Sequence, residues 1–356
     1  MSLDALLLSR WSHAASEGVM RTNVDDTMRR RIPGELGLVI QFNPSHLKSK
    51  RPVDKQLLVP PPIAEPAQPK TSAFNFTKAR RNEFLSGLCF VTADEQRLPS
   101  VQAVEETEEI EKDAEHFVLV NVAPLVRGHI LVVPDLNCVR PQKMTKAYLT
   151  YALSITQAIQ RNDFALGFNS AGAWSSVNHF HLQGYYFPQV ERATNFPVAA
   201  QRREEMFRVD GGVVKGLPQW KTTCYAIEPE DPNGNALHVV ETAWALLELL
   251  QGRGVPHNLL VVGMVVFIFP RQAQQENGVN LFSTFSAADA DGSPVHPGRL
   301  RIAVAELSGL VIAGDSVAYE NLTEEMFSSI LQTEVSLSVS EQAELVSQWK
   351  EKLVSK

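Results

Sequence analysis

Residues 177–187 alternate polar and apolar side chains, and this alternation constrains the fold more than any other stretch of the chain. In a β-strand, residues two apart point to the same face, so His179, His181 and Gln183 would share one face. The residues between them would then pack behind the strand. Two imidazoles and an amide are costly to bury without partners. The pattern therefore predicts a strand whose polar face borders a cleft.

The chemistry of His179 and His181 allows three interpretations. Histidines two apart on a strand can share a zinc ion, but further ligands are needed, and the other histidines offer no second close pair. Both rings can instead be structural, with their nitrogens satisfied by hydrogen bonds in the sheet. A neutral imidazole can also attack phosphorus or an acyl carbon when a hydrogen bond to its other nitrogen fixes the tautomer. The surrounding motif favours this third interpretation.

Residues 116–187 are predicted to form a compact α+β unit with an antiparallel sheet. Two β-rich runs, 117–122 and 130–134, are each followed or closed by a proline and are predicted to form a hairpin. Residues 144–160 have helical periodicity, and their apolar face consists of Tyr148, Ala152, Ile155 and Ile159. A third strand at 164–169 leads through a loop of small residues to the polar-faced strand.

The part of the chain before this unit is less regular. Residues 1–34 show no clear period and are predicted to form a loosely attached extension. A strand is expected at 36–42, a proline-rich extended linker at 60–69, and a helix around 78–86. The acidic residues at 103–115 are expected to form a solvated loop or helix face.

The later half repeats such elements less clearly. A helix is predicted at 236–251, and a last helix is predicted to begin at the capping box formed by Ser338 and Glu341. Residues 277–297, which are rich in small and polar side chains, are expected to be a mobile insertion. Strands are predicted in the apolar runs at 216–227, 258–270 and 300–307.

Composition excludes several classes of protein. With 356 residues and 44% hydrophobic content, the chain can bury a large core, and its net charge of −7 argues against nucleic acid as the main partner. Three scattered cysteines, Cys89, Cys138 and Cys224, form neither a disulfide framework nor a zinc ribbon. No signal peptide or membrane-spanning segment is predicted. We therefore expect a cytoplasmic protein that binds neither nucleic acid nor membrane.

A composite motif places the two histidines in a wider context. Its first part reads Asn121-x-x-Pro124-x-x-x-Gly128-His129-x-Leu131-x-x-Pro134. Its second part consists of Asn169, Gly172 and the run Ser176-Val177-Asn178-His179-x-His181-x-Gln183. In order, spacing and linking helix, this motif resembles the histidine triad superfamily of nucleotide hydrolases and transferases.

The resemblance implies a role for each polar residue. In that superfamily the position matched by His181 attacks the α-phosphorus of a nucleotide, while those matched by His179 and Gln183 flank the phosphate. Asn169 and Ser176 match positions that contact phosphate oxygens or the ribose, although a simple polar turn would also account for both residues. Many hydrolases of the superfamily carry a third histidine where this chain has Gln183, whereas transferases such as galactose-1-phosphate uridylyltransferase carry glutamine. The glutamine therefore suggests transfer to an acceptor other than water.

The resemblance narrows outside this motif to the GDP-hexose phosphorylases, which comprise GDP-D-glucose phosphorylases and plant GDP-L-galactose phosphorylases. The N-terminal matches are Gln41-Phe42-Asn43, Lys50-Arg51-Pro52 and Phe74-Asn75-Phe76-Thr77-Lys78. The C-terminal matches are His257-Asn258-Leu259-Leu260, Phe267-Ile268-Phe269-Pro270 and Ala305-Glu306-Leu307-Ser308-Gly309. The chain departs from the family at Leu310, where a histidine is frequent.

The fold that the resemblance implies is α+β, with a histidine triad-like antiparallel sheet in two packed halves as in the uridylyltransferases. Residues 35–200 are expected to form the half that carries the motif, and residues 201–356 are expected to form a degenerate half.

The activity implied is phosphorolysis of GDP-D-glucose or GDP-L-galactose to GDP and hexose 1-phosphate, through a covalent GMP on His181. Lys78 is a candidate for binding phosphate, and Lys50, Arg51 and Arg127 are further cations that could balance the charge of the substrate. No metal or cofactor is required, and a monomer or homodimer is expected. Two alternatives stay open: a nucleotide hydrolase of the same superfamily, and a non-catalytic protein that binds nucleotide sugars.

Overall fold

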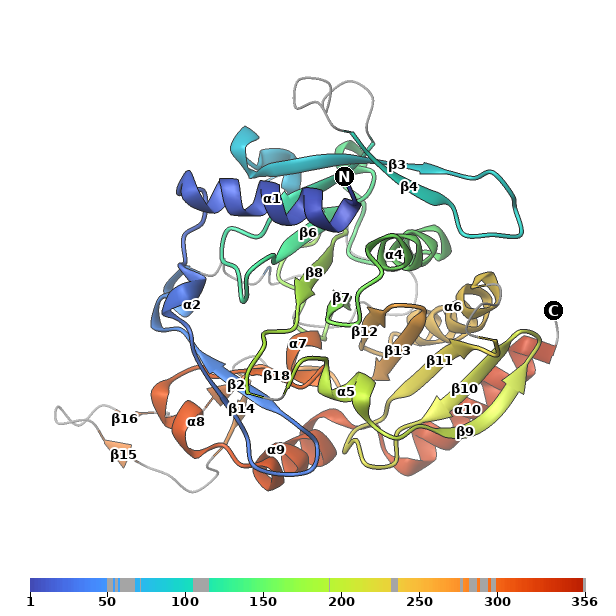
Figure 1. Cartoon of the computed structure of the whole chain (residues 1–356). Coiled ribbons are helices and arrows are strands. Elements are labelled where there is room, and N and C mark those ends of the chain that lie inside the picture. Colours follow the sequence, from blue (N-terminus) through green and yellow to red (C-terminus); the bar gives the residue numbers. More distant parts are fainter. Residues whose placement is uncertain are drawn as a thin grey trace.

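The structure is a computed structural model that describes residues 1–49, 54, 57, 68–70, 72–104, 115–191, 193–231, 236–275, 278–281, 287–288, 294–295 and 299–354. A large antiparallel β-sheet runs through the molecule (Figure 1). Its strands are β3 (Phe84–Val91), β4 (Ser100–Val104), β5 (His116–Val120), β6 (Ile130–Val133), β7 (Phe164–Asn169), β8 (Leu182–Tyr186), β9 (Glu204–Val209), β10 (Gly212–Gly216), β11 (Tyr225–Pro229), β12 (His257–Val262) and β13 (Val265–Pro270). They lie in the order β4-β3-β5-β6-β8-β7-β12-β13-β11-β10-β9.

Helices and smaller sheets surround this sheet. The helices are α1 (Leu3–Ser16), α2 (Pro44–Ser49), α4 (Lys146–Ile159), α5 (Pro197–Ala200), α6 (Leu237–Gly252), α7 (Val304–Leu307), α8 (Ser316–Asn321), α9 (Glu324–Ile330) and α10 (Val339–Val354). Short helical turns are η1 (Val24–Asp26), η3 (Phe76–Lys78), η4 (Arg81–Glu83), η5 (Leu136–Cys138) and η6 (Leu331–Val335). A second sheet contains β1 (Met28–Arg31), β2 (Val39–Phe42) and β18 (Leu310–Ile312). Two short ladders pair β14 (Val279–Asn280) with β17 (Arg299–Leu300), and β15 (Ala287–Ala288) with β16 (Pro294–Val295).

The two halves of the main sheet repeat one topology. In the first half, the hairpin β5-β6 is followed by α4 and by the pair β7-β8, and β8 joins β6. In the second half, the hairpin β10-β11 is followed by α6 and by the pair β12-β13, and β13 joins β11. Strands β7 and β12 pair with each other and make the two halves one continuous sheet. The expected α+β fold with two packed halves is confirmed.

The halves differ in the connection that carries the histidines. Residues 170–181 link β7 to β8 and include both His179 and His181. The equivalent link between β12 and β13 consists of Gly263 and Met264 alone. The second half therefore repeats the scaffold without the histidine-bearing loop.

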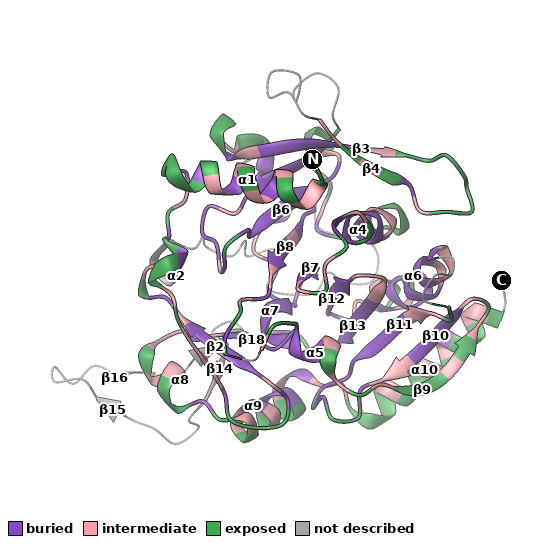
Figure 2. Ribbon diagram, viewed as in Figure 1, coloured by how far each residue is buried: buried purple, intermediate pink, exposed green. Residues whose placement is uncertain are grey.

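Each face of the main sheet carries its own layer. Helices α1, α4, α6 and α10 cover one face, where Leu149, Leu246 and Phe168 belong to a single buried core (Figure 1). On the other face, β2, β18, α7 and α9 enclose a second core that includes Tyr185 and Phe267. The central strands β5, β6, β8, β7, β12 and β13 are almost entirely buried, whereas the edge strands β4 and β9 are exposed or half-buried (Figure 2). Burial on both faces explains why many of the strands read as continuous apolar runs rather than as alternating ones.

Several predicted elements are confirmed. The hairpin and the strand β7 form as expected, and α4 begins at Thr145, whose hydroxyl accepts a hydrogen bond from the backbone N–H of Tyr148 (3.1 Å). Its predicted apolar face is buried. Helix α6 matches the predicted helix, and Ser338 and Glu341 form the predicted capping box of α10.

Residues 1–34 do not form the loosely attached extension that we expected. Leu7, Trp11 and Ala14 on α1 are buried against the main core, and β1 pairs with β2. The indole N–H of Trp11 donates to the carbonyl of His129 (3.1 Å). The apolar residues of this helix are too evenly mixed with polar ones to show a clear period, so the prediction was wrong.

Three other predictions are also wrong, each at a boundary with irregular structure. Residues 78–86 form parts of two short turns and the start of β3 instead of a helix. Residues 300–307 contain the short helix α7 rather than a strand. The strand predicted at 177–187 begins only at Leu182. The proline-rich linker, the acidic segment and the expected insertion lie largely outside the described residues.

We expect Trp11→Ala to lower the free energy of unfolding by about 3–5 kcal/mol, because it removes a fully packed ring and a hydrogen-bond donor from the core. Urea titration measures this change. His13→Ala, on the exposed side of the same helix, should change it by less than about 0.5 kcal/mol. Equal stabilities of the two variants would show that α1 is only loosely attached.

Candidate active site

A pocket of about 420 Å³ opens on the face of the main sheet opposite α4 and α6. One wall comes from the first half: the loop 170–181 and the facing residues of β6, β7 and β8. The other wall comes from the end of the chain, where α7 and the segment after β18 contribute. The pocket therefore lies between the two halves of the protein.

The backbone of His181 is held on both sides by one side chain. Its N–H donates to Oε1 of Gln142 (2.9 Å), and its carbonyl accepts from Nε2 of Gln142 (3.1 Å). The ring nitrogen Nδ1 of His181 lies 2.9 Å from the carbonyl of His179. Because a carbonyl only accepts, Nδ1 carries the proton in this pair. The lone pair of the neutral ring therefore lies on Nε2, and the ring lines the pocket.

Burial keeps both imidazoles neutral. It lowers the pKa of His181 from 6.5 to about 4, against the opposing effect of the hydrogen bond to the carbonyl of His179. Burial, with a smaller contribution from His181, lowers the pKa of His179 to about 4. At neutral pH, His181 is therefore an unprotonated imidazole with a fixed tautomer, which is the state that nucleophilic attack requires.

His179 and His181 do not share one face of a strand. The segment before β8 leaves the sheet, so only His181 lines the pocket, while His179 is fully buried beside Phe76. The backbone N–H of Phe76 donates to Nδ1 of His179 (3.0 Å). The ring of Phe76 lies 5.4 Å from that of His179 and 5.1 Å from that of His181. The aromatic segment around Phe76 thus fixes both histidines from one side.

Three further residues that the resemblance assigns to substrate binding line the pocket with His181: Asn169, Ser176 and Gln183. Asn169 also joins the two halves, because its Oδ1 accepts from Nδ2 of Asn258 (2.6 Å) and from the backbone N–H of Val304 (3.0 Å). This approach of α7 requires Gly167, since an added Cβ would lie 2.8 Å from the side chain of Val304. The structure therefore brings Asn169, Ser176, His181 and Gln183 together at one pocket, where Oδ1 of Asn169 is already engaged.

Two of the cations predicted to balance the charge of the substrate, Lys78 and Arg127, lie away from the pocket lining. Lys78 is exposed, and its ammonium donates to the carbonyl of Ala73 (2.6 Å) rather than lining the pocket. Arg127 is also exposed and donates to Ser12 (3.3 Å). Lys50 and Arg51 lie outside the described residues. Arg301, which no sequence pattern distinguishes, lines the pocket instead.

Sequence reasoning also missed the residues that hold the motif in place. Gln142 stands before α4 in a stretch without any recognisable pattern, and Asn258 sits among the apolar residues of β12. Asn258 accepts from Arg271 (3.4 Å), whose pKa burial lowers to about 10. A signal for the role of Asn258 was its position near the start of an otherwise apolar strand, because a buried amide needs partners.

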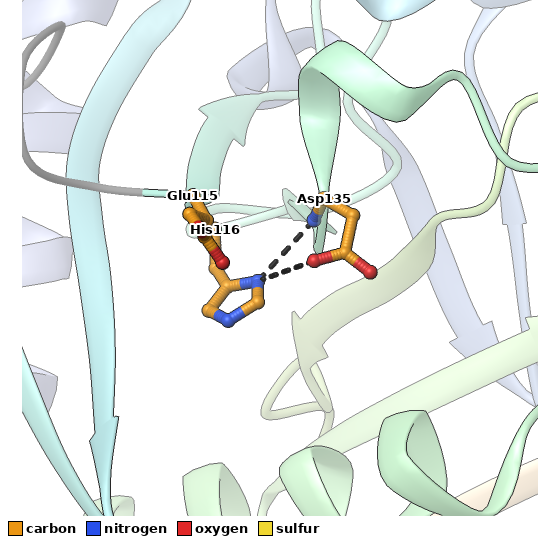
Figure 3. A group of neighbouring side chains, drawn as sticks. All are labelled: Glu115, His116 and Asp135. Atoms are coloured by element: carbon orange, nitrogen blue, oxygen red, sulfur yellow. Dashed lines mark hydrogen bonds and ion pairs between the residues drawn. The ribbon is translucent and has the colours of Figure 1, made fainter.

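A cluster of possible metal ligands lies away from the pocket. Within the described ranges, Glu115, His116 and Asp135 place one ligand atom each within 4.8 Å of one another (Figure 3). Nδ1 of His116 accepts from the backbone N–H of Asp135 (3.2 Å), and Asp135 accepts from the hydroxyl of Tyr148 on α4 (2.7 Å). These contacts explain His116 and Asp135 as part of the packing of α4 against the hairpin.

Solved structures share this fold over nearly the whole chain. Yeast Ap4A phosphorylase Apa2 superimposes with a TM-score of 0.57 at 15% identity, over 95% of this chain and 97% of that one. Its complex with AMP gives a TM-score of 0.56 at 17% identity, over 93% and 97%. The likeness at this identity concerns the fold alone.

Two family matches together cover most of the sequence. Residues 2–185 match the family described as GDPGP1-like, N-terminal domain, and residues 218–356 match GDPGP1-like, C-terminal domain. The chain belongs to the GDPGP1-like family. The first match ends in β8, and the second begins between β10 and β11, three strands that Figure 1 labels.

Relatives with assigned names are similar over nearly the whole chain. GDP-L-galactose phosphorylase 2 of Arabidopsis thaliana is 26% identical over 341 residues, which are 94% of this chain and 73% of that protein. GDP-D-glucose phosphorylase 1 of Danio rerio is 25% identical over 92% of this chain and 85% of its own length. The Homo sapiens protein of that name is 25% identical over 92% and 78%. Among the described helices, none has the length and hydrophobicity to cross a membrane.

Buried neutral histidines make the stability depend on pH. Burial lowers the pKa of His257 to about 4, although its ring donates to the carbonyl of Val255 (2.9 Å). An unfolded histidine takes up its proton near pH 6.5, so between about pH 6.5 and 4 the unfolded chain binds more protons. We expect the free energy of unfolding to fall as pH decreases from 7 to 5.

His257→Asn, which retains a donor near the position of Nδ1, should lose less stability over this range, by on the order of 1–2 kcal/mol. Urea titrations of both proteins at pH 7 and pH 5 measure the difference. Identical losses in the two proteins would contradict a buried neutral His257.

We expect Gln142→Leu to lower the free energy of unfolding by about 2–4 kcal/mol, because it leaves the N–H and carbonyl of His181 without their side-chain partner. Gln96→Leu, a matched change at an exposed position, should alter it by less than about 0.5 kcal/mol. Thermal or urea unfolding of both variants measures this difference in stability. If Gln142→Leu is as stable as Gln96→Leu, the hydrogen bonds from Gln142 to the backbone of His181 do not stabilise the fold.

Proposed function

We propose that this protein is a GDP-hexose phosphorylase that converts GDP-D-glucose or GDP-L-galactose and phosphate into GDP and hexose 1-phosphate. The observation that carries the proposal is the hydrogen bond from Nδ1 of His181 to the carbonyl of His179, which leaves Nε2 as the nucleophilic atom at the pocket. Membership of the GDPGP1-like family and similarity to proteins named GDP-L-galactose and GDP-D-glucose phosphorylases support the substrate class.

The first step forms a covalent intermediate. The lone pair on Nε2 of His181 attacks the α-phosphorus, a new N–P bond forms, and the bond from that phosphorus to the bridging oxygen breaks. Hexose 1-phosphate leaves with the electron pair. Because a phosphate needs little protonation to depart, the step requires no strong general acid. The positive charge that develops on the ring is stabilised by the hydrogen bond from Nδ1 to the carbonyl of His179.

The second step returns the histidine to its neutral state. An oxygen of inorganic phosphate attacks the same phosphorus, the N–P bond breaks, and GDP is released with the electron pair of the broken bond left on Nε2. No proton has to be removed from the acceptor, because phosphate already carries an anionic oxygen. Splitting one displacement into two in this way is the usual benefit of nucleophilic catalysis.

The polar residues of the pocket have distinct roles in this scheme. Gln183 and Ser176 donate hydrogen bonds to the α-phosphate, and the amide of Asn169 contacts phosphate or ribose. His179 acts as a positioning residue through its carbonyl and through its contact with Phe76. The pocket volume of about 420 Å³ is within the usual range for small-molecule sites, roughly 300–1,000 Å³.

The proposal includes a cytoplasmic location and a monomer or homodimer that acts without nucleic acid or membrane. Free cysteines at positions 89, 138 and 224 support a reducing compartment. The net charge of −7 argues against binding to a nucleic-acid backbone.

The test is product analysis after incubation with GDP-D-glucose or GDP-L-galactose, with and without phosphate. We expect GDP and hexose 1-phosphate only when phosphate is present, and loss of turnover by orders of magnitude in His181→Ala. Without phosphate, intact-mass analysis should show a GMP adduct on the wild type and none on His181→Ala.

Exposed His13 on α1 provides the matched control, since His13→Ala should retain full activity. Release of GMP without phosphate would indicate a hydrolase instead. Binding of GDP-sugars without turnover or adduct would indicate a non-catalytic binding protein.

A further inference from the structure

The pocket holds little positive charge for a ligand that carries two phosphates. Among the described residues that line it, Arg301 is the only arginine or lysine, while Glu306 and Asp315 contribute carboxylates. His181 is neutral because burial lowers its pKa to about 4. A nucleoside diphosphate brought into this pocket therefore needs Arg301 to balance its charge.

The two carboxylates are already engaged in local structure. Glu306 accepts from the backbone N–H of Ala303 at the start of α7 (2.8 Å), and Asp315 accepts from the N–H of Ala318 at the start of α8 (2.7 Å). Both therefore cap short helices, which is a common use of acidic residues at these positions. Neither is paired with Arg301 among the ion pairs found within the described ranges.

Arg301 instead lies on an aromatic ring. Its guanidinium carbon is 5.3 Å from the centre of the Trp174 ring, and its side chain is exposed at the pocket. A guanidinium held over an aromatic ring keeps N–H groups available for hydrogen bonds to a ligand. It can therefore meet a phosphate with two parallel hydrogen bonds without first breaking an ion pair.

Trp174 is held rigidly in the loop that carries the motif. Its φ of +69° is unusual for a bulky residue, and the strain requires support from its surroundings. Its backbone N–H donates to Oε1 of Gln274, and the N–H of Gln274 donates to the carbonyl of Gly172 (2.7 Å). Trp174 also lies two residues before Ser176, and both line the pocket with His181.

We propose that Arg301 binds the phosphoryl group opposite His181, first as the β-phosphate of the nucleotide sugar and then as the inorganic phosphate acceptor, and that Trp174 positions Arg301. This inference rests on the proposed function. The leaving and attacking oxygens occupy the same place, because each lies opposite the N–P bond in its own displacement. One cation can therefore serve both steps. Holding phosphate there places it, rather than water, against the covalent intermediate.

The affinities for GDP and GMP, measured by calorimetry, test this role without turnover. The wild type should bind GDP more tightly than GMP, because only GDP has a β-phosphate. Arg301→Met should weaken GDP binding by about 10- to 100-fold, the range for charge-assisted hydrogen bonds, and leave GMP binding within about twofold. Arg301→Lys, which keeps the charge but loses the bidentate geometry, should lie between them.

Arg127→Met is the matched control, since Arg127 is exposed and does not line the pocket. It should leave both affinities unchanged. The role of Trp174 is tested in the same way: Trp174→Phe should keep the preference for GDP, and Trp174→Leu should reduce it while GMP binding is retained.

The outcomes separate this inference from the function on which it rests. If the wild type binds neither GDP nor GMP, both the role of Arg301 and the proposed phosphorylase function are wrong. If it binds both equally, or if Arg301→Met changes the two affinities by the same factor or not at all, Arg301 does not hold the β-phosphate. In that case His181 and the phosphorylase assignment still stand.

Discussion

The hydrogen bond between Nδ1 of His181 and the carbonyl of His179 is the interaction on which the rest of the pocket depends. It joins a ring to a carbonyl two residues earlier, so the chain must leave the extended conformation just before β8. The backbone then loses its ladder partners and needs others. Gln142 supplies them for His181, and the carbonyl of Arg140 accepts from the N–H of Phe180 (2.7 Å). The hydrogen bonds to Phe180 and His181 therefore hold the segment before α4 in place.

The second half of the sheet contributes structure rather than a second site. It repeats the strand order of the first half, but Gly263 and Met264 replace the loop that holds the histidines. Its polar residues are directed to the first half: Asn258 donates to Asn169, and the N–H of Val304 donates to the same oxygen. The second half thus completes one wall of the pocket, while His181 and Gln183 come from the first half.

What the sequence could predict follows from the range of each interaction. Helix α4 and strand β7 have local periodicity and were recognised, as were the motif residues His181, Gln183 and Ser176 through their spacing. Gln142 and Arg301 were missed because their roles depend on contacts far along the chain. Lys78 was misplaced for the converse reason, since its position in a matching motif did not reveal where its side chain points.

The shared oxygen of Asn169 also determines when the pocket can be completed during synthesis. Its partner Val304 lies 135 residues later in the chain, so the first half emerges from the ribosome long before the wall formed by α7 exists. Strand β7 must meanwhile wait for β12 to cover its free edge. The loop that carries His181 is thus synthesised early, and the pocket that it lines is enclosed only after α7 has been made.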